Sequence, residues 1–247
     1  MGVARSVRIY YGGRDRMRRM TALYRQFVKP GDLVFDIGSH VGDRIAAFRH
    51  LGCRVVAVEP QPAAFRFLRM AYARRSDVTL VHAAVSDRPG TLALRLNIAN
   101  PTVSTASSAF IDAAQGASGW EGQNWEETVE VRAVTLDELV AAHGVPAFAK
   151  IDVEGFEHEA LKGLSRPLPA LSFEFTTIQR DVAEGCLARL ALLGDYRFNV
   201  ALGESQELAF PEPIAAHAML SHLRGLPHEA NSGDVYAVLR RDTKAAD

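Results

Sequence analysis

One segment constrains the fold of this chain more than any other. Residues 33–42 read LVFDIGSHVG, a short apolar run that ends in Asp36 and continues into a turn with Gly38 and Gly42. An apolar run of this length followed by glycines predicts a buried β-strand that leads through a loop into a helix. Dinucleotide binders carry Gly-x-Gly-x-x-Gly at this point, because a pyrophosphate needs a bare backbone. The spacing here therefore favours a cofactor that has no pyrophosphate.

Strand and helix patterns alternate along much of the chain. Apolar strands are expected near residues 33–37, 54–59, 78–81, 147–151 and 170–175, with helical patterns after them. Such alternation predicts an α/β fold with parallel strands and right-handed crossovers. Further strands are expected at 91–97, 128–134, 197–202 and 235–239.

The length and composition fit one domain. The chain has 247 residues, 48% of them hydrophobic, and a formal net charge of -1. This is enough for one sizeable core, so residues 1–247 are treated as a single domain. The small net charge gives no overall field that favours nucleic acid, so we do not expect a nucleic-acid partner. No window reaches the roughly 18 apolar residues of a membrane span, and cysteine is sparse, so a cytoplasmic location is expected.

Three segments fall outside the regular alternation. Residues 1–30 are rich in arginine and predict a basic helical extension, either a solvated face or a contact for an anionic ligand. Residues 98–127 and 203–233 are long connections, which are often functional lids, and we expect both to wall an acceptor site. For 98–127 the alternative is a disordered insertion. Its Trp120 and Trp125 either stack on a substrate ring or anchor the loop.

Acidic residues follow several of the expected strands. Asp36 ends the first strand and Glu59 the second, Asp152 follows the fourth, and Glu174 lies within the fifth. Ligands of open parallel sheets bind at this edge. A buried carboxylate needs a partner to offset its lost hydration, and a sulfonium, an ammonium or a metal ion would serve. Asp36 and Glu59 together suit S-adenosylmethionine, since one acid meets its cationic methionine part and the other its ribose. The structural alternative for Asp36 and Asp152 is helix capping.

Four segments, in the right order and spacing, resemble the FkbM family of class I S-adenosylmethionine-dependent methyltransferases. They are VFDIGSHVG (34–42), VAVEP (56–60), AAVSD (83–87) and KIDVEGFE (150–157). The resemblance implies a doubly wound, mostly parallel, seven-stranded Rossmann-like sheet with helices on both faces. It also implies methyl transfer from S-adenosylmethionine to a hydroxyl of a small molecule or a sugar, of natural-product or glycan type.

The resemblance assigns roles by position. The turn meets the methionine part, Glu59 takes the ribose, Ala84 and Val85 flank the adenine, and Asp152 faces the transferring methyl group. Gln61 and His82 depart from the residues that are common in the family. The predicted cofactor-binding residues are Asp36, Gly38, Ser39, Gly42, Glu59, Pro60, Gln61, Ala84, Val85 and Asp152.

A hydroxyl is a poor nucleophile at neutral pH, so its proton needs an acceptor. The candidate catalytic residues are Asp152, His158 and Glu174, with Asp152 or His158 as general base. In a second route, Asp152, Glu154 and Glu174 gather a divalent cation that lowers the pKa of the acceptor hydroxyl. We favour the route without a metal, because Glu154 is expected to point away from the cleft.

Other classes of protein share parts of this pattern. A nucleic-acid methyltransferase or another N-methyltransferase would use the same cofactor site. Many N-methylating enzymes carry Asn/Asp-Pro-Pro-aromatic after the fourth strand, where this chain has Asp-Val-Glu-Gly at 152–155. A nicotinamide dehydrogenase is disfavoured by the glycine spacing. A non-catalytic module that binds S-adenosylmethionine is the third alternative.

Overall fold

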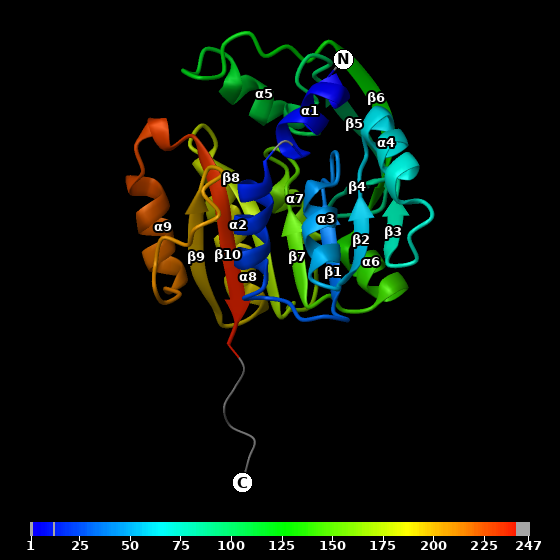
Figure 1. Ribbon diagram of the computed structural model, residues 1–247. Helices are drawn as coiled ribbons and strands as arrows, with labels where there is room; N and C mark the ends of the chain where they lie inside the picture. Colours follow the sequence, from blue (N-terminus) through cyan, green and yellow to red (C-terminus); the bar gives the residue numbers. More distant parts are fainter. Residues whose placement is uncertain (1, 12, 241–247) are drawn as a thin grey trace.

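A seven-stranded sheet forms the centre of the computed structural model, which describes residues 2–11 and 13–240 (Figure 1). Its order is β3-β2-β1-β7-β8-β10-β9. The pairs from β3 to β8 are parallel, and β10 runs antiparallel to both β8 and β9. The prediction of a mostly parallel, doubly wound sheet is confirmed. The strands are β1 (Leu33–Ile37), β2 (Arg54–Val58), β3 (Val78–Val81), β7 (Phe148–Ile151), β8 (Ala170–Thr176), β9 (Tyr196–Leu202) and β10 (Ser232–Leu239).

Helices cover both faces of this sheet (Figure 1). Successive side chains of a strand point to opposite faces, so both faces of an apolar strand can be buried. In β1, Val34 packs in a core cluster with residues of α2, α3 and α4, whereas Phe35 packs in a second cluster with residues of α6, α7 and α8. These helices are α2 (Arg14–Tyr24), α3 (Asp43–His50), α4 (Pro62–Tyr72), α6 (Leu136–His143), α7 (Glu157–Lys162) and α8 (Arg180–Leu193).

The helix ends follow local sequence signals. The Thr135 hydroxyl accepts a hydrogen bond from the Glu138 amide, and the Glu138 carboxylate accepts one from the Thr135 amide. This capping box begins α6. Helix α4 begins at Pro62 and not at Pro60, because Gln61 still has an extended backbone.

A second, three-stranded sheet with the order β4-β6-β5 lies beside the first. The strand pattern at 91–97 and 128–134 was correctly predicted, but the pattern alone did not show that these strands leave the main sheet. β5 pairs antiparallel with β6, and the short β4 pairs parallel with it. The bounds are β4 (Ala84–Val85), β5 (Gly90–Leu96) and β6 (Glu127–Val134).

Segment 98–127 has its own small core and is not a disordered insertion. It contains the 3-10 helix η1 (Pro101–Val103) and helix α5 (Ser108–Ala114), which lies above the carboxyl edge of the sheet (Figure 1). The Phe110 ring meets the Trp120 ring edge-on at 5.2 Å between centroids, and Trp125 Nε1 donates to the Val103 carbonyl at 2.8 Å. The two tryptophans therefore anchor the loop, which was one of the two predicted roles.

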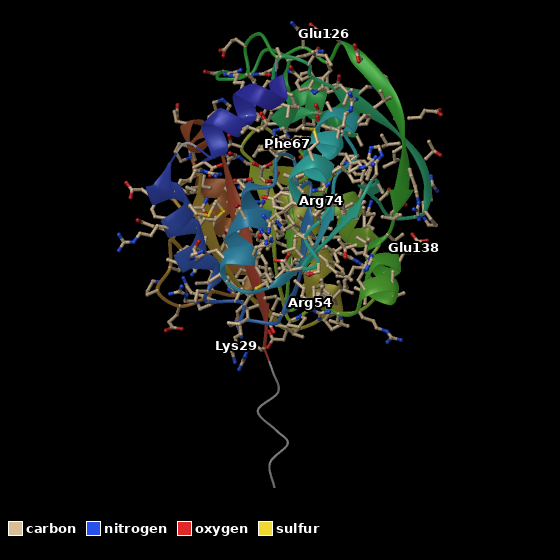
Figure 2. The ribbon with its side chains drawn as sticks, turned by 45° about the vertical axis from the view of Figure 1, so that its right-hand side comes forward. Lys29, Arg54, Phe67, Arg74, Glu126 and Glu138 are labelled. Atoms are coloured by element: carbon tan, nitrogen blue, oxygen red, sulfur yellow. The ribbon has the colours of Figure 1, made fainter. Side chains whose placement is uncertain are left out.

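The N-terminal extension forms α1 (Gly2–Tyr11) and α2. Lys29 lies near Arg54 at the amino end of the sheet, at the opposite end of the molecule from Glu126 (Figure 2). The arginine side chains mostly face water, as predicted for a solvated face, but Arg16 does not. Arg5, Arg18, Arg19 and Arg25 are exposed, and the side chains of Arg8 and Arg14 lie outside the described residues. Within residues 2–11 and 13–240, the helices are all too short or too polar to cross a membrane.

Candidate active site

One cavity lies at the carboxyl ends of β1, β2, β7 and β8, and it measures about 1170 Å³ with its open mouth. Segment 98–127 covers it with Thr102, Ser104 and Ala106. All of the predicted cofactor-binding residues line this cavity except Gly42: Asp36, Gly38, Ser39, Glu59, Pro60, Gln61, Ala84, Val85 and Asp152.

The two glycines of the first turn have different structural roles. Gly38 has φ +83°, and a Cβ at this position would lie 1.8 Å from the carbonyl oxygen of Asp152. The loops after β1 and β7 can approach this closely only because Gly38 has no side chain. A Cβ on Gly42 would instead meet Leu68 and Tyr72 of α4 at 2.9 Å. Gly42 therefore serves helix packing. The sequence predicted it as a cofactor-binding residue, but it does not line the cavity.

Asp36 is a buried acid on the cavity wall, with 1% of its surface exposed. Its Oδ2 atom has no hydrogen-bond partner among the described residues. Burial raises the pKa of Asp36 to about 7. Its own backbone carbonyl accepts a hydrogen bond from the Ser39 hydroxyl at 2.7 Å, which fixes the start of the turn. A cationic ligand in the cavity would favour the ionised form of this carboxyl group.

Glu59 is held rigidly by the backbone. Its Oε2 accepts from the His40 amide and its Oε1 from the Gln61 amide, both at 2.7 Å. Burial nevertheless raises the pKa of Glu59 to about 7. A carboxylate has about four acceptor positions, so this one can still accept hydrogen bonds from ligand hydroxyls. The Gln61 side chain donates to the Pro101 carbonyl at 3.0 Å and so ties the cavity wall to segment 98–127.

Another part of the cavity wall is apolar and is formed by the second sheet. Ala84 and Val85 of β4 and Leu94 of β5 contribute to it. This surface suits a flat aromatic ring, in keeping with the adenine-flanking role predicted for Ala84 and Val85. His82 lies outside the cavity, where its ring stacks on Phe65 at 4.3 Å between centroids.

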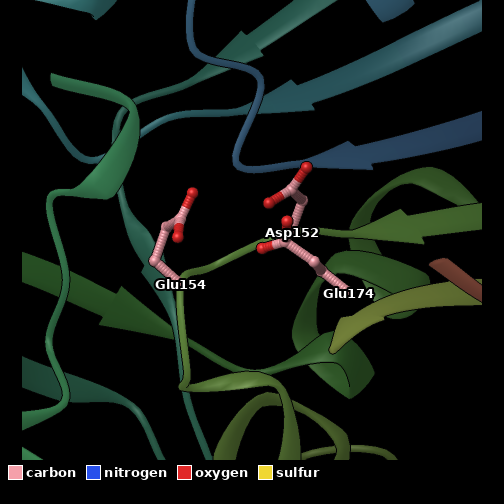
Figure 3. Close-up of side chains that lie close together, drawn as sticks. All are labelled: Asp152, Glu154 and Glu174. Carbon is pink, nitrogen blue, oxygen red and sulfur yellow. The ribbon is translucent and has the colours of Figure 1, made fainter. Parts of the chain in front are cut away.

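Three carboxyl groups gather at the far side of the cavity. One oxygen each of Asp152, Glu154 and Glu174 lies within 4.8 Å of the others. Figure 3 shows Asp152 and Glu174 next to one another at neighbouring strand ends, with Glu154 facing them from the loop. The expectation that Glu154 points away from the cleft is wrong. Its backbone has φ +54°, and its carbonyl accepts from the Thr105 hydroxyl at 2.6 Å, which fixes the loop in this orientation.

A buried lysine neutralises part of this cluster. Lys150 Nζ donates to Asp152 Oδ2 at 3.0 Å and to Asp234 Oδ1 at 2.7 Å, and only 1% of its side chain is exposed. The sequence places Lys150 inside an apolar strand, where a lysine requires an acidic partner. It gave no sign of Asp234, because that partner comes from the last strand.

The environments of Asp152 and Glu174 shift their pKa values in opposite directions. Burial alone would raise the pKa of Asp152, but the nearby Lys150 and Arg44 cations outweigh it and hold this pKa below its usual range. For Glu174, burial and the negative charges of Asp152 and Glu154 raise the pKa well above its usual range. Two neighbouring carboxyls with pKa values pushed apart are typical of sites that transfer protons.

Two expectations from the sequence need correction. His158 lies on α7 with its ring against Gly185 of α8, where a Cβ would come within 2.5 Å of Nδ1, and it lies outside the cavity. The structure therefore does not support His158 as a general base. Segment 203–233 reaches the cavity only at its two ends, because α9 (Ala216–Gly225) packs against α8. The lid role fits segment 98–127 far better.

A charged cluster on the cavity wall, next to the turn after β1, was not foreseen. Asp43, Arg44 and Glu204 line the cavity, and Arg16 of α2 pairs with both acids. Arg16 and Glu204 are 188 residues apart in the chain. Only the excess of arginine in the N-terminal segment hinted at a contact of this kind.

The sheet order and the acids at the ends of β1 and β2 agree with the doubly wound fold that the resemblance to class I methyltransferases implies. Residues 36–204 match the Methyltransferase FkbM domain, and the chain belongs to this family.

Two curated methyltransferases are similar to this chain in sequence. Hexuronic acid methyltransferase AglP of Haloferax volcanii is 30% identical over 155 residues, which cover 61% of this chain and 57% of that protein. The 31-O-demethyl-FK506 methyltransferase FkbM of Streptomyces tacrolimicus is 30% identical over 161 residues, which cover 56% of this chain and 61% of that protein. The chain thus matches about three fifths of the length of each relative. Among solved structures, an O-methyltransferase from Bacillus cereus in complex with SAH is matched over 97% of this chain and 90% of its own, with a TM-score of 0.44 and 13% identity.

Proposed function

We propose that this chain transfers the methyl group of S-adenosylmethionine to a hydroxyl oxygen of a small molecule or a sugar. The observation that carries the proposal is the shared cavity of Asp36, Glu59 and Asp152 at the carboxyl ends of three adjacent strands. Family membership supports the reaction class. The names of the two relatives, one acting on a hexuronic acid and one on 31-O-demethyl-FK506, support a hydroxyl-bearing acceptor.

The residues of the cavity fit the cofactor. Oδ2 of the buried Asp36, which has no hydrogen-bond partner within residues 2–11 and 13–240, is an acceptor for the methionine ammonium, and Glu59 has lone pairs left for both ribose hydroxyls. Ala84 and Val85 form the apolar surface for the adenine. When bound, S-adenosylmethionine supplies a methyl group activated by a sulfonium.

The remaining task of the chain is to hold the acceptor and take its proton. Productive transfer requires the acceptor oxygen about 3 Å from the methyl carbon. Asp152 and Glu174 lie at the part of the cavity where a hydroxyl can reach both. Glu174 can take the hydroxyl proton only in its ionised form, in which its raised pKa makes it the stronger base of the two, whereas Asp152 stays ionised and orients the hydroxyl.

A divalent cation held by Asp152, Glu154 and Glu174 is the competing way to activate the hydroxyl. Since Glu154 faces the cavity, its orientation no longer argues against this route. Lys150 argues against the metal route, because its ammonium already pairs with one Asp152 oxygen and would repel a divalent cation. We therefore retain the route without a metal.

The test is an intact-mass screen of hydroxyl-bearing acceptors, with hexuronic acids and macrolides among them, in the presence of S-adenosylmethionine. We expect a gain of one methyl group on the acceptor with the wild-type chain, and no gain with Asp36→Asn or Asp152→Asn. Fragmentation of the product locates the methyl group. Its appearance on nitrogen would favour the N-methyltransferase alternative, and a lack of heat on titration with S-adenosylhomocysteine would reject the cofactor assignment.

A further inference from the structure

Arg44 is a largely buried cation on the cavity wall, with 14% of its side chain exposed. It stands in the first turn of α3, directly after the turn that begins at Asp36. Arg44 Nη1 donates to Asp43 Oδ2 at 2.8 Å, and Nη2 lies 3.9 Å from Glu204 Oε1. The buried Nε has no hydrogen-bond partner within the described part of the chain. A buried donor in this state is costly unless a ligand supplies the acceptor.

Arg16 holds the acids around Arg44 in place. Its Nη1 donates to the same Asp43 oxygen at 2.6 Å, and its Nη2 and Nε donate to Glu204 Oε2 at 2.9 and 3.2 Å. Arg16 belongs to α2, which precedes the family match that begins at residue 36. An element outside the family domain therefore fixes two residues of the cavity wall.

Asp36 and Arg44 flank the turn and present opposite charges to one cavity. An α-amino acid carries an ammonium and a carboxylate on the same carbon, so its recognition requires such a pair of charges. A guanidinium is well suited to the carboxylate, because its donors are planar and it stays charged when buried.

We infer that Arg44 binds the carboxylate of the cofactor's methionine part, opposite Asp36 at its ammonium, and that Arg16 is a positioning residue that holds Arg44 through Asp43 and Glu204. The inference rests on the proposed function, since it names a subsite for the cofactor. The inference gives helix α2, which carries Arg16, a role in cofactor binding.

Calorimetry with two probes separates this subsite from the rest of the cavity. The probes are S-adenosylhomocysteine and its decarboxylated form, S-adenosyl-3-thiopropylamine, which keeps the ammonium and lacks only the carboxylate. We expect the wild type to bind S-adenosylhomocysteine roughly ten- to a hundredfold more tightly than the amine, as charge-assisted hydrogen bonds allow. Arg44→Met should abolish this preference, because it removes the group that distinguishes the two probes. Asp36→Asn should weaken the binding of both probes.

Variants of α2 test the positioning role. Arg16→Gln should reduce the preference for S-adenosylhomocysteine, whereas Arg19→Gln, an exposed arginine on the same helix, should keep it in full. Thermal unfolding of each variant checks that the fold is retained. Equal weakening of both probes in Arg44→Met, or an intact preference, would overturn the carboxylate subsite. An intact preference in Arg16→Gln would overturn the role of Arg16. A wild type that binds neither probe would instead reject the proposed function itself.

Discussion

Lys150 Nζ lies 2.7 Å from Asp234 Oδ1, a contact between strands β7 and β10 that spans 84 positions of the chain. Strand β8 separates the two in the sheet, and Glu174 of β8 is the direct cross-strand neighbour of Asp234. The same ammonium pairs with Asp152. One buried cation is thus shared by Asp152 and Asp234, while Glu174, whose strand lies between theirs, has no ion pair with a residue of the described part of the chain. The family match ends at residue 204, so Asp234 lies outside it. The last strand therefore contributes a site residue that the matched domain does not contain.

The first prediction concerns the stability contributed by Lys150. Its replacement in Lys150→Met leaves Asp152 and Asp234 without their shared cation. Breaking a buried ion pair on one side costs about 3–5 kcal/mol, because the remaining charge stays buried. We expect the free energy of unfolding to fall by this amount, measured by urea denaturation at pH 7.

Lys162→Met is the matched control for that measurement. Lys162 pairs with Glu159 on the exposed side of α7, at 2.6 Å, with 43% of its side chain exposed. Exposed pairs contribute less than about 1 kcal/mol. An equal fall in the free energy of unfolding in the two variants would show that the buried ion pairs of Lys150 contribute no more to stability than the exposed pair of Lys162.

The second prediction concerns the turn glycines. Gly38→Ala places a Cβ against the Asp152 carbonyl oxygen, so the loop after β1 or β7 must move. We expect loss of most of the affinity for S-adenosylhomocysteine, measured by calorimetry. Gly31→Ala is the control, since Gly31 also has a positive φ, of +89°, but has open space around its Cβ position. It should cost about 1–2 kcal/mol of stability and leave the affinity intact. Normal binding by Gly38→Ala would contradict the steric argument.

Much of the fold could be predicted, because the signals that define it are local. The strand that contains Asp36, the strand that ends before Glu59 and the capping box of α6 each depend on residues within a few positions of one another. The second sheet could not be predicted in the same way. Alternation marks β5 and β6 as strands, but it does not say which neighbours they pair with.

The candidate site was predictable to the same extent. Acids at strand ends identify the cavity, since parallel strands bring their carboxyl ends to one edge. The pairs that fix the charge of the site are different, because they join distant segments: Lys150 with Asp234, and Arg16 with Glu204. His158 was misplaced because helical spacing does not show which face of α7 meets a neighbour.

The third prediction follows from the pKa of Asp36. Burial raises this pKa to about 7 in the folded chain, against about 3.9 in an unfolded one. The folded state therefore keeps a proton that the unfolded state has already lost, so the contribution of Asp36 to stability is complete below about pH 4 and is lost progressively as the pH rises from about 4 through about 7. Asp36→Asn has no such dependence. Its free energy of unfolding, relative to the wild type, should rise between pH 5 and pH 8 in urea titrations. A difference that stays constant over this range would show that Asp36 is ionised throughout.

The last prediction concerns the need for a metal. Asp152, Glu154 and Glu174 are close enough to surround a cation, yet one oxygen of Asp152 already accepts from Lys150 at 3.0 Å. A divalent ion would have to displace the ammonium or bind beside it, and like charges at this distance in a buried site repel strongly. We therefore expect methyl transfer to survive treatment with EDTA and titration with MgCl2 to produce no heat.

Lys150→Met provides the contrast within that experiment. Removing the ammonium leaves the three carboxylates without a nearby positive charge from β7, which should favour a cation. We expect this variant, if it stays folded in a thermal melt, to bind Mg²⁺ more tightly than the wild type. Wild-type activity that disappears with EDTA and returns with Mg²⁺ would show instead that the cluster is a metal site. In that case Glu174 would be a ligand, and the proton of the acceptor would leave by another route.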